Sequence, residues 1–190
     1  EFADNHESWS AQISALSRRF TCIAFNARGY PPSEVPENPD LYSQKIAAED
    51  INSVLEGYSL EKAHIVGCSM GAFAALHFAI LYPEKASSIS LLSCGYGAPK
   101  EQQAAYAEDA EMLADKYLEL GSEEMAELYA NGAFRQQFKN KDFRGWRAFK
   151  DRLSNHSKHG AALTMLGVQR KRPSLYDLKE EISKVEVPAL

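Results

Sequence analysis

The stretch that most constrains the fold is 62–81, where a short apolar run meets Gly67-Cys68-Ser69-Met70-Gly71 and continues as a longer apolar segment. Residues 64–66 are typical of a strand, and residues 72–81 are apolar on all faces, which is typical of a buried helix. A Gly-x-Ser-x-Gly turn between a buried strand and a buried helix forces its serine into a strained backbone conformation. We expect the two glycines of the turn to leave room for the helix to pass close to the strand.

This arrangement makes Ser69 a candidate nucleophile. The turn pushes the serine hydroxyl out at the end of the sheet, beside the start of the following helix. Unpaired backbone N–H groups and the positive end of the helix dipole favour negative charge that develops there. A pattern of five residues also occurs by chance in ordinary turns, but a strand before it and a helix after it are the context of an active site.

The chain has 190 residues, the length of one domain, and its net charge is -5. This charge argues against nucleic acid or an anionic membrane as the main partner. The longest apolar run, 71–82, is too short to cross a bilayer, and no signal peptide is visible. We therefore expect a cytoplasmic protein that acts on a small molecule. The sequence does not indicate its oligomeric state.

Cysteine and histidine spacing does not indicate a metal site. Cys22, Cys68 and Cys94 each lie in or beside an apolar run, where a small buried side chain fits, and three thiols cannot all pair. They indicate a reducing compartment. His156 and His159 come nearest to the spacing of metal ligands, but they stand at the end of a predicted surface helix, and we expect both to be solvated.

Strands and helices alternate along the first half of the sequence. The pattern predicts a helix at 9–20 capped by Ser8, a strand at 21–25, a helix at 42–55 and a strand at 86–92. Continuously apolar strands that alternate with helices indicate a parallel sheet covered on both faces by helices. We expect the strand before Ser69 to lie in the middle of that sheet. Ligands bind at the carboxyl ends of such strands, and Ser69, Asn26 and Cys94 all follow strand ends.

The second half of the sequence is predominantly helical. The predicted helices are at about 99–120, 122–131, 133–139, 143–156 and 158–168. A helical insertion between two strands of a parallel sheet is a lid. The chain thus divides into the first part of a core at 1–97, a lid at 98–172, and a return to the core at 173–190, which includes a helix at 174–182 and the start of a strand at 185–190. The first lid helix is acidic and the later ones are basic, which favours helices that pair with one another over a site for an anion.

Two aromatic residues are candidates for contact with a substrate. Tyr96 follows the strand at 86–92, and Trp146 lies in the lid with Phe149 and Tyr129. Aromatic residues at helical spacing lie in a core more often than in a pocket, so both interpretations of Trp146 stay open.

The order of elements resembles the α/β-hydrolase superfamily. The resemblance rests on Arg28-Gly29 after a strand, the elbow at 67–71, the helical insertion and the terminal Val-Pro-Ala-Leu. More narrowly, the chain is similar to the lidded bacterial group that includes small esterases, enol-lactonases, proline iminopeptidases and carbon–carbon bond hydrolases. The resemblance covers the whole chain and implies an α/β-hydrolase core, incomplete at both ends, with an all-helical lid.

The resemblance also implies an oxyanion hole. In that family the segment before Trp9 carries a His-Gly-x motif whose third residue donates one N–H, and the residue after the nucleophile donates the other. Alignment on Trp9 puts Phe2 at the first donor position and Met70 at the second. Asn26 stands where many members have aspartate, a departure that we expect to affect only the shape of the loop.

We expect the acid and the histidine base that would activate the nucleophile to be missing from this chain. A serine needs a base within hydrogen-bond reach, itself held by a carboxylate. The family places the acid after the strand that begins at Val185, and the histidine after one more strand, both beyond Leu190. His77 is eight residues along the helix from Ser69, about 12 Å of rise away, and cannot touch the hydroxyl. We therefore expect an internal piece of a longer hydrolase, inactive by itself.

The expected reaction is hydrolysis of an ester, lactone, amide or activated carbon–carbon bond through an acyl-enzyme on Ser69, without a cofactor. A serine at the elbow, in place of an aspartate, argues against dehalogenase or epoxide hydrolase chemistry. Two alternatives stay open. One is a non-catalytic protein that binds a small molecule on the same scaffold, and the other is an esterase whose base is His156 or His159 in the lid.

Overall fold

The computed structural model describes residues 1–190, and the backbone contacts divide the chain into two compact units. Unit 1 comprises Glu1–Phe2, Asn38–Leu113 and Leu163–Leu190, and unit 2 comprises Ala3–Glu37 and Ala114–Ala162. The predicted lid is shared between them, because residues 98–113 and 163–172 lie in unit 1. None of the helices combines the length and the apolar composition that a membrane-spanning helix needs.

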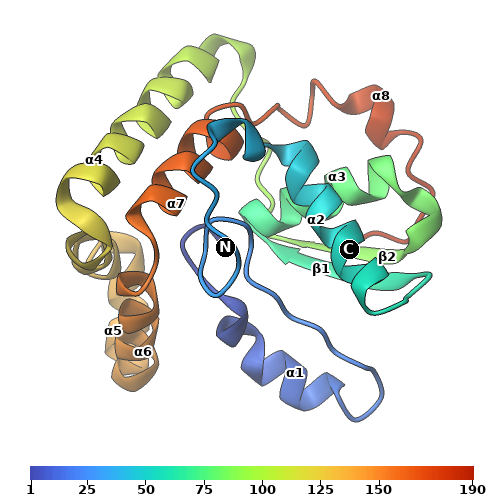
Figure 1. Ribbon diagram of the computed structural model, residues 1–190, viewed down its shortest axis with the longest axis horizontal. Helices are drawn as coiled ribbons and strands as arrows, with labels where there is room; N and C mark the ends of the chain where they lie inside the picture. Colours follow the sequence, from blue (N-terminus) through green and yellow to red (C-terminus); the bar gives the residue numbers. More distant parts are fainter. The chain divides into compact units, whose positions relative to one another are not determined.

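Unit 1 contains a parallel sheet (Figure 1). Strands β1 (Ala63–Cys68) and β2 (Ala86–Leu92) pair in parallel, with Ile65 opposite Ile89. A third segment begins on the other side of β2, where Ala189 bridges to Ile89 in parallel. The parallel sheet and the start of a strand near the end of the chain confirm the sequence-based predictions. β1 lies at the edge of the described sheet, not in its middle as predicted.

Helices α2 (Gln44–Gly57) and α3 (Met70–Leu81) form the core of unit 1 with the sheet. Ser43 caps α2, because its hydroxyl accepts a hydrogen bond from the Ile46 N–H at 3.1 Å. Helix α3 is apolar all round, since it contacts α2 on one side and both strands on the other. The buried core consists of Ala48, Ile51, Leu55, Leu76, Phe78, Ala79, Ala86 and Ile89.

The side chains of β1 alternate between this core and a more open face. Ile65 packs against the core, whereas His64 is exposed and Val66 is 48% exposed. On the open face, the His64 Nδ1 atom lies 2.7 Å from the Ser88 hydroxyl of β2. His64 is therefore occupied by a contact within the sheet.

The helices predicted after residue 98 are present. They are α4 (Gln103–Ala130), α5 (Gln136–Lys141), α6 (Phe143–Ser154), α7 (Lys158–Thr164) with a π-helical continuation (Met165–Gln169), and the short α8 (Lys179–Ile182). Helix α4 is broken at Gly121, where φ is 79° and ψ is 169°. This break agrees with the predicted boundary between residues 120 and 122. The helix predicted at 174–182 is shorter than expected, with turns over 175–178.

The start of unit 2 differs from the prediction. The first helix is a 3₁₀ turn (His6–Trp9) followed by α1 (Ser10–Leu16), and its cap is Asn5 instead of Ser8. Residues 21–25 form no strand. An apolar run becomes a strand only where a neighbouring strand takes up its backbone hydrogen bonds, and these residues do not join the sheet of β1 and β2.

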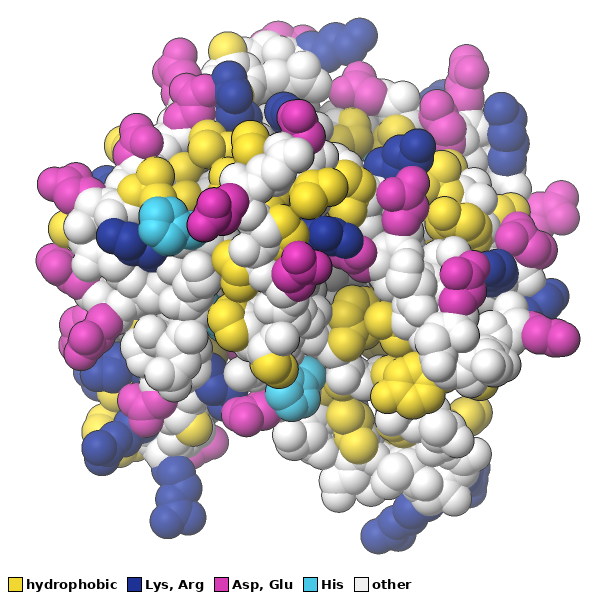
Figure 2. All heavy atoms as spheres, viewed as in Figure 1, with side chains coloured by type: hydrophobic (Ala, Val, Ile, Leu, Met, Phe, Trp, Pro, Cys, Tyr) yellow, Lys and Arg dark blue, Asp and Glu magenta, His cyan; other side chains and the backbone are white.

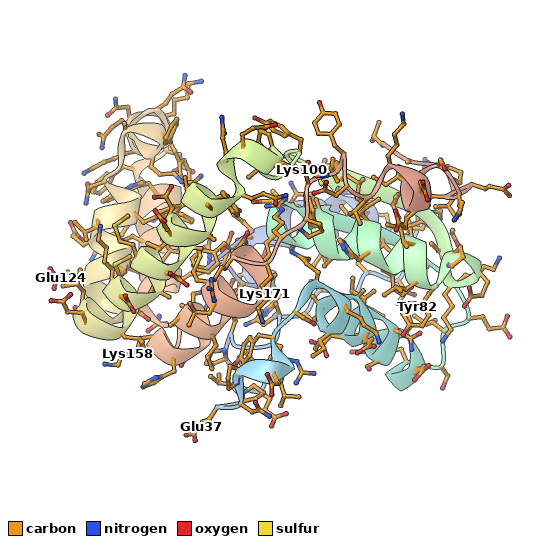
Figure 3. All side chains as sticks on the ribbon, turned by 90° about the horizontal axis from the view of Figure 1, so that it is seen from above. Glu37, Tyr82, Lys100, Glu124, Lys158 and Lys171 are labelled. Atoms are coloured by element: carbon orange, nitrogen blue, oxygen red, sulfur yellow. The ribbon has the colours of Figure 1, made fainter.

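Opposite charges on the lid helices pair within unit 2. Lys150 Nζ lies 2.7 Å from a Glu127 carboxylate oxygen, and Lys158 on α7 donates to the Leu118 carbonyl at 3.0 Å. Figure 3 shows Lys158 and Glu124 among these helices. Acidic and basic side chains are also interspersed on the face that Figure 2 presents. Contacts between these helices therefore explain part of their pattern of acidic and basic residues.

Candidate functional site

The turn between β1 and α3 places Ser69 in a strained conformation. Ser69 has φ 53° and ψ -112°, a region that side chains other than glycine rarely occupy. The Ser69 N–H donates to the Leu92 carbonyl at 2.9 Å, which ties the turn to the end of β2. Its hydroxyl makes no capping bond to α3, and the residue is partly exposed. Ser69 therefore presents a hydroxyl that the local fold does not use.

The two glycines of the turn differ in what surrounds them. A Cβ atom on Gly67 would lie 2.1 Å from the Gly71 carbonyl oxygen, so only glycine lets α3 start this close to β1. A Cβ atom on Gly71 would meet nothing within 4 Å. The close approach of helix and strand thus depends on Gly67 alone.

Both predicted oxyanion donors lie in unit 1 with the elbow. Met70 is the first residue of α3, so its N–H has no carbonyl partner within the helix. The carbonyl of Ser69 accepts from the N–H groups of Ala72 and Phe73 and begins the helical ladder. Phe2 is half-buried at the start of the chain.

Arg172 joins the segment after β2 to the first turn of α3. Its guanidinium carbon lies 3.5 Å from the centre of the Phe73 ring, and its Nη2 donates to the Cys94 carbonyl. The N–H of Phe73 donates in turn to the Ser69 carbonyl at 3.2 Å. A positive charge is thereby held over the first turn of the helix that follows the elbow.

The two ends of the lid lie side by side in unit 1. The Leu175 N–H donates to the Tyr96 carbonyl at 2.9 Å. Gly97, at φ 76°, packs so closely on Pro173 that a Cβ atom would lie 2.7 Å from its carbonyl oxygen. The chain therefore leaves the core after β2 and returns beside the same point.

The candidate substrate-binding residues occupy different environments. The Tyr96 ring is exposed and packs edge-on against Tyr176, with ring centres 6.4 Å apart. Trp146 is buried in unit 2, where its indole N–H donates to the Ala130 carbonyl at 2.7 Å and its ring stacks on Phe143. Trp146 thus serves the packing of unit 2, whereas Tyr96 is 55% exposed.

His77 of unit 1 and His6 of unit 2 each have contacts of their own. His77 Nδ1 lies 2.9 Å from the Phe73 carbonyl, and burial, together with the charge of Arg172, lowers its pKa. In unit 2, His6 bonds the side chain of Asn26, whose amide nitrogen donates to the Pro31 carbonyl at 2.6 Å. An aspartate at position 26 could not donate that bond, so the asparagine shapes this loop.

The prediction that His156 and His159 are both solvated is wrong for His156. His159 is exposed, but His156 is only 8% exposed and packs against the edge of the Tyr30 ring, with centres 5.0 Å apart. Residue 156 follows α6, and the contact with Tyr30 spans more than a hundred residues of sequence. Helical spacing alone contains no signal for such a contact.

The chain offers no group of three histidine, cysteine or acidic side chains that could hold a metal ion. Its cysteines are free and half-buried, and burial raises the pKa of the Cys94 thiol. Two hollows in unit 1, of about 630 and 230 Å³, are not lined by Ser69. The larger lies at the amino ends of the strands, and the smaller is beside Arg172. Figure 3 shows Lys171, which also lines the smaller hollow, on the side of unit 1 away from Tyr82 at the end of α3.

Comparison with known proteins identifies the family of this fold. Residues 2–136 match the family described as alpha/beta hydrolase fold, a segment that includes the elbow and both strands. The chain belongs to the α/β-hydrolase family. Among curated proteins, this α/β-hydrolase chain is 34% identical over 92 residues to epoxide hydrolase 1 of Caenorhabditis elegans, covering 48% of the chain and 22% of that protein. It is 32% identical over 87 residues to 3-oxoadipate enol-lactonase 1 of Acinetobacter baylyi, covering 46% of the chain and 32% of that protein.

Solved structures show the same α/β-hydrolase fold. A hydrolase from Pseudomonas aeruginosa PA01 superimposes with a TM-score of 0.84 at 22% identity, over 100% of this chain and 67% of the other. The match of this chain thus spans about a fifth to a third of the two curated relatives and two thirds of that solved structure. The likeness confirms the predicted fold class and the predicted family resemblance.

Proposed function

We propose that this α/β-hydrolase chain carries the nucleophile of a serine hydrolase whose substrate is a small ester, lactone, amide or activated carbon–carbon compound. The observation that carries the proposal is the backbone of Ser69, strained at φ 53° between β1 and α3, with a hydroxyl that caps nothing. Strained residues of this kind persist where function requires them. The enol-lactonase relative adds weight to acyl chemistry.

In the proposed mechanism the Ser69 oxygen attacks the carbonyl carbon of the substrate. The Met70 N–H at the start of α3 and the Phe2 N–H donate to the oxygen that becomes negative, and the dipole of α3 favours the same charge. A general base takes the proton of the Ser69 hydroxyl as the bond to the carbonyl carbon forms, and gives it to the alcohol, amine or carbanion that leaves. The same base then takes a proton from water, whose oxygen attacks the acyl carbon and releases the acid and Ser69. His77 is excluded as this base, because it stands eight residues after Ser69 along α3, about 12 Å of rise away.

The epoxide hydrolase relative points to a second reaction, which the elbow disfavours. A carboxylate at the elbow would attack an epoxide and form an ester that water then hydrolyses. Ser69 would instead form an ether, which water does not cleave under mild conditions. We therefore propose acyl transfer and expect no diol product from an epoxide substrate.

Labelling of the whole protein with a fluorophosphonate probe tests the proposal. We expect the probe to modify Ser69, and Ser69→Ala to abolish both the labelling and the turnover of short acyl esters and lactones. Ser59→Ala is the matched control, because Ser59 is an exposed serine with φ 55° at the end of α2. Labelling that survives in Ser69→Ala would end the assignment, and a wild-type protein that binds ligands without being labelled would favour the non-catalytic binding protein.

A further inference from the structure

The loop 93–97, which follows β2, begins beside the predicted nucleophile. The Ser69 N–H donates to the Leu92 carbonyl at 2.9 Å, and Ser93 is the next residue along the chain. Three of the five loop residues have positive φ angles, which are 50° at Ser93, 67° at Gly95 and 76° at Gly97. Serine rarely adopts such an angle, and strained residues gather at sites that bind ligands. Ser93 therefore combines backbone strain with a place at the carboxyl end of the sheet, where ligands bind.

Arg172 holds the start of this loop against α3. Its Nη2 donates to the Cys94 carbonyl, and its guanidinium carbon lies 3.5 Å from the centre of the Phe73 ring. The Phe73 N–H donates to the Ser69 carbonyl at 3.2 Å, so the arginine contacts the helical turn that follows the nucleophile. One side chain thus connects the loop after β2 with the first turn of α3.

The end of the loop is held by Ser174 and Leu175. The Tyr96 carbonyl accepts hydrogen bonds from the Ser174 hydroxyl at 3.2 Å and from the Leu175 N–H at 2.9 Å. Ser174 is only 2% exposed, so water does not compete for its bond. Residues 69–97 and 172–175 all belong to unit 1. The place of the loop beside Ser69 is therefore set within one compact unit.

The charge of Arg172 is not neutralised by an acid. Its guanidinium contacts a carbonyl and a ring, and its Nε atom is buried without a hydrogen-bond partner. By contrast, Arg170 lies 2.7 Å from a Glu111 carboxylate oxygen. A positive charge beside the loop favours electron-rich groups there. The exposed Ser93 hydroxyl forms no hydrogen bond within the protein, so it can donate to such a group.

We propose that Arg172 is a positioning residue that holds the loop 93–97 beside Ser69, and that the Ser93 hydroxyl donates a hydrogen bond to an acceptor on the acyl part of the substrate. The inference rests on the proposed function and narrows its substrate class. The substrates are acyl compounds that carry an oxo group, or another hydrogen-bond acceptor, a few atoms from the carbonyl that Ser69 attacks.

The first experiment measures whether Arg172 holds the loop, and it needs no activity. We expect Arg172→Met to increase hydrogen exchange of the Leu175 amide in the whole protein by at least about tenfold, because its bond to the Tyr96 carbonyl opens locally. Exchange of the amides inside α3 should stay unchanged. Arg170→Met is the matched control, since Arg170 pairs with Glu111 instead of the loop. Arg172→Lys should give a smaller increase, because lysine keeps the charge but not the planar stack.

The second experiment compares two esters of equal chain length, p-nitrophenyl 4-oxopentanoate and p-nitrophenyl pentanoate. We expect Ser93→Ala to lower kcat/KM for the oxo ester about threefold to tenfold, the effect of one hydrogen bond, and to change kcat/KM for the plain ester less than about twofold. Arg172→Met should reduce the same preference, because the hydroxyl is misplaced. A purely structural role of either residue would lower both values alike.

Ser93→Gly separates the hydroxyl from the strain. Glycine adopts a φ of 50° without cost, so this variant should be at least as stable as the wild-type protein and still lose the preference for the oxo ester. Ser59→Gly is the matched control, because Ser59 is exposed, has φ 55° and precedes the start of β1, at the other end of the strand from Ser69. It should keep the preference.

The outcomes separate this inference from the proposed function. Unchanged Leu175 exchange in Arg172→Met would overturn the positioning role. An unchanged preference in Ser93→Ala and Ser93→Gly would overturn the bond to the substrate and leave Ser69 as nucleophile. A wild-type protein without turnover or fluorophosphonate labelling of Ser69 would overturn the proposed function and the role of Ser93 with it, and the exchange experiment would still decide whether Arg172 holds the loop.

Discussion

The two glycines of the elbow differ in what an added methyl group would meet. At Gly67 an added Cβ atom would overlap the backbone of Gly71, and backbone atoms cannot move aside as the end of a flexible side chain can. At Gly71 the same atom would enter open space. The contact of strand and helix therefore requires glycine at position 67, and the surroundings of Gly71 leave room for a larger side chain.

We predict that Gly67→Ala lowers the free energy of unfolding by about 3 kcal/mol or more, because overpacking against backbone displaces α3. Gly71→Ala is the matched substitution, and it should leave stability unchanged or raise it by up to about 1 kcal/mol through helix propensity. Denaturant unfolding of both variants measures the difference. Equal losses in the two variants would contradict the geometry of the elbow.

The buried His156 predicts how stability depends on pH. Its folded pKa is lowered from 6.5, so the unfolded chain binds more protons between the folded pKa and that value. The free energy of unfolding should therefore fall as the pH drops through this window and level off below the folded pKa. The groups that face His156 are Asp4, Arg152 and Tyr30, and their net effect does not reverse that of burial.

His156→Leu tests this prediction, because it removes the titrating group and keeps an apolar side chain in the same space. We expect the loss of stability between about pH 7.5 and pH 5 to be smaller in this variant than in the wild-type protein. His77, whose pKa is also lowered by burial, titrates in both proteins and cancels in the comparison. An identical pH dependence would mean that folding does not lower the pKa of His156.

At the scale of elements, the break in α4 depends on backbone conformation and not on packing. Gly121 has open space around it, but its φ of 79° and ψ of 169° lie in a region that only glycine occupies readily. The sequence predicted separate helices at about 99–120 and 122–131, and the break at Gly121 agrees with that boundary.

Gly121→Ala should cost about 1–3 kcal/mol of stability through backbone strain alone. Gly57→Ala, at the end of α2, is the matched control, because an added Cβ atom also meets nothing there and φ is not positive. Thermal unfolding of the two variants checks the difference. A Gly121→Ala protein as stable as Gly57→Ala would show that the two halves of α4 can join without strain.

The strand predicted at 21–25 shows where element prediction fails. The run is apolar and is followed by a stretch rich in turn-forming residues, as a strand would be, yet it forms no strand. A helix makes its hydrogen bonds within itself, whereas a strand depends on a neighbour that is distant in the sequence. The helices of the lid were therefore predictable with small errors at their ends, and this strand was not.

At the scale of the whole molecule, one chain folds into two compact units. The parallel arrangement of β1 and β2 and the adjacent ends of the lid follow from the order of elements along the sequence. The assignment of residues 3–37 to unit 2 does not follow from that order, because it depends on contacts such as Tyr30 with His156.

The sequence by itself determined the elbow, the parallel sheet, the helical lid and the break at Gly121. Each of these depends on local backbone limits or on the spacing of apolar residues, and both are readable over a few turns of chain. Only the tertiary structure decided that Gly67 and not Gly71 is irreplaceable for packing, that residues 21–25 stay unpaired, and that His156 is buried beside Ala3. Those outcomes depend on which distant atoms meet, and no property of a single segment specifies its partner.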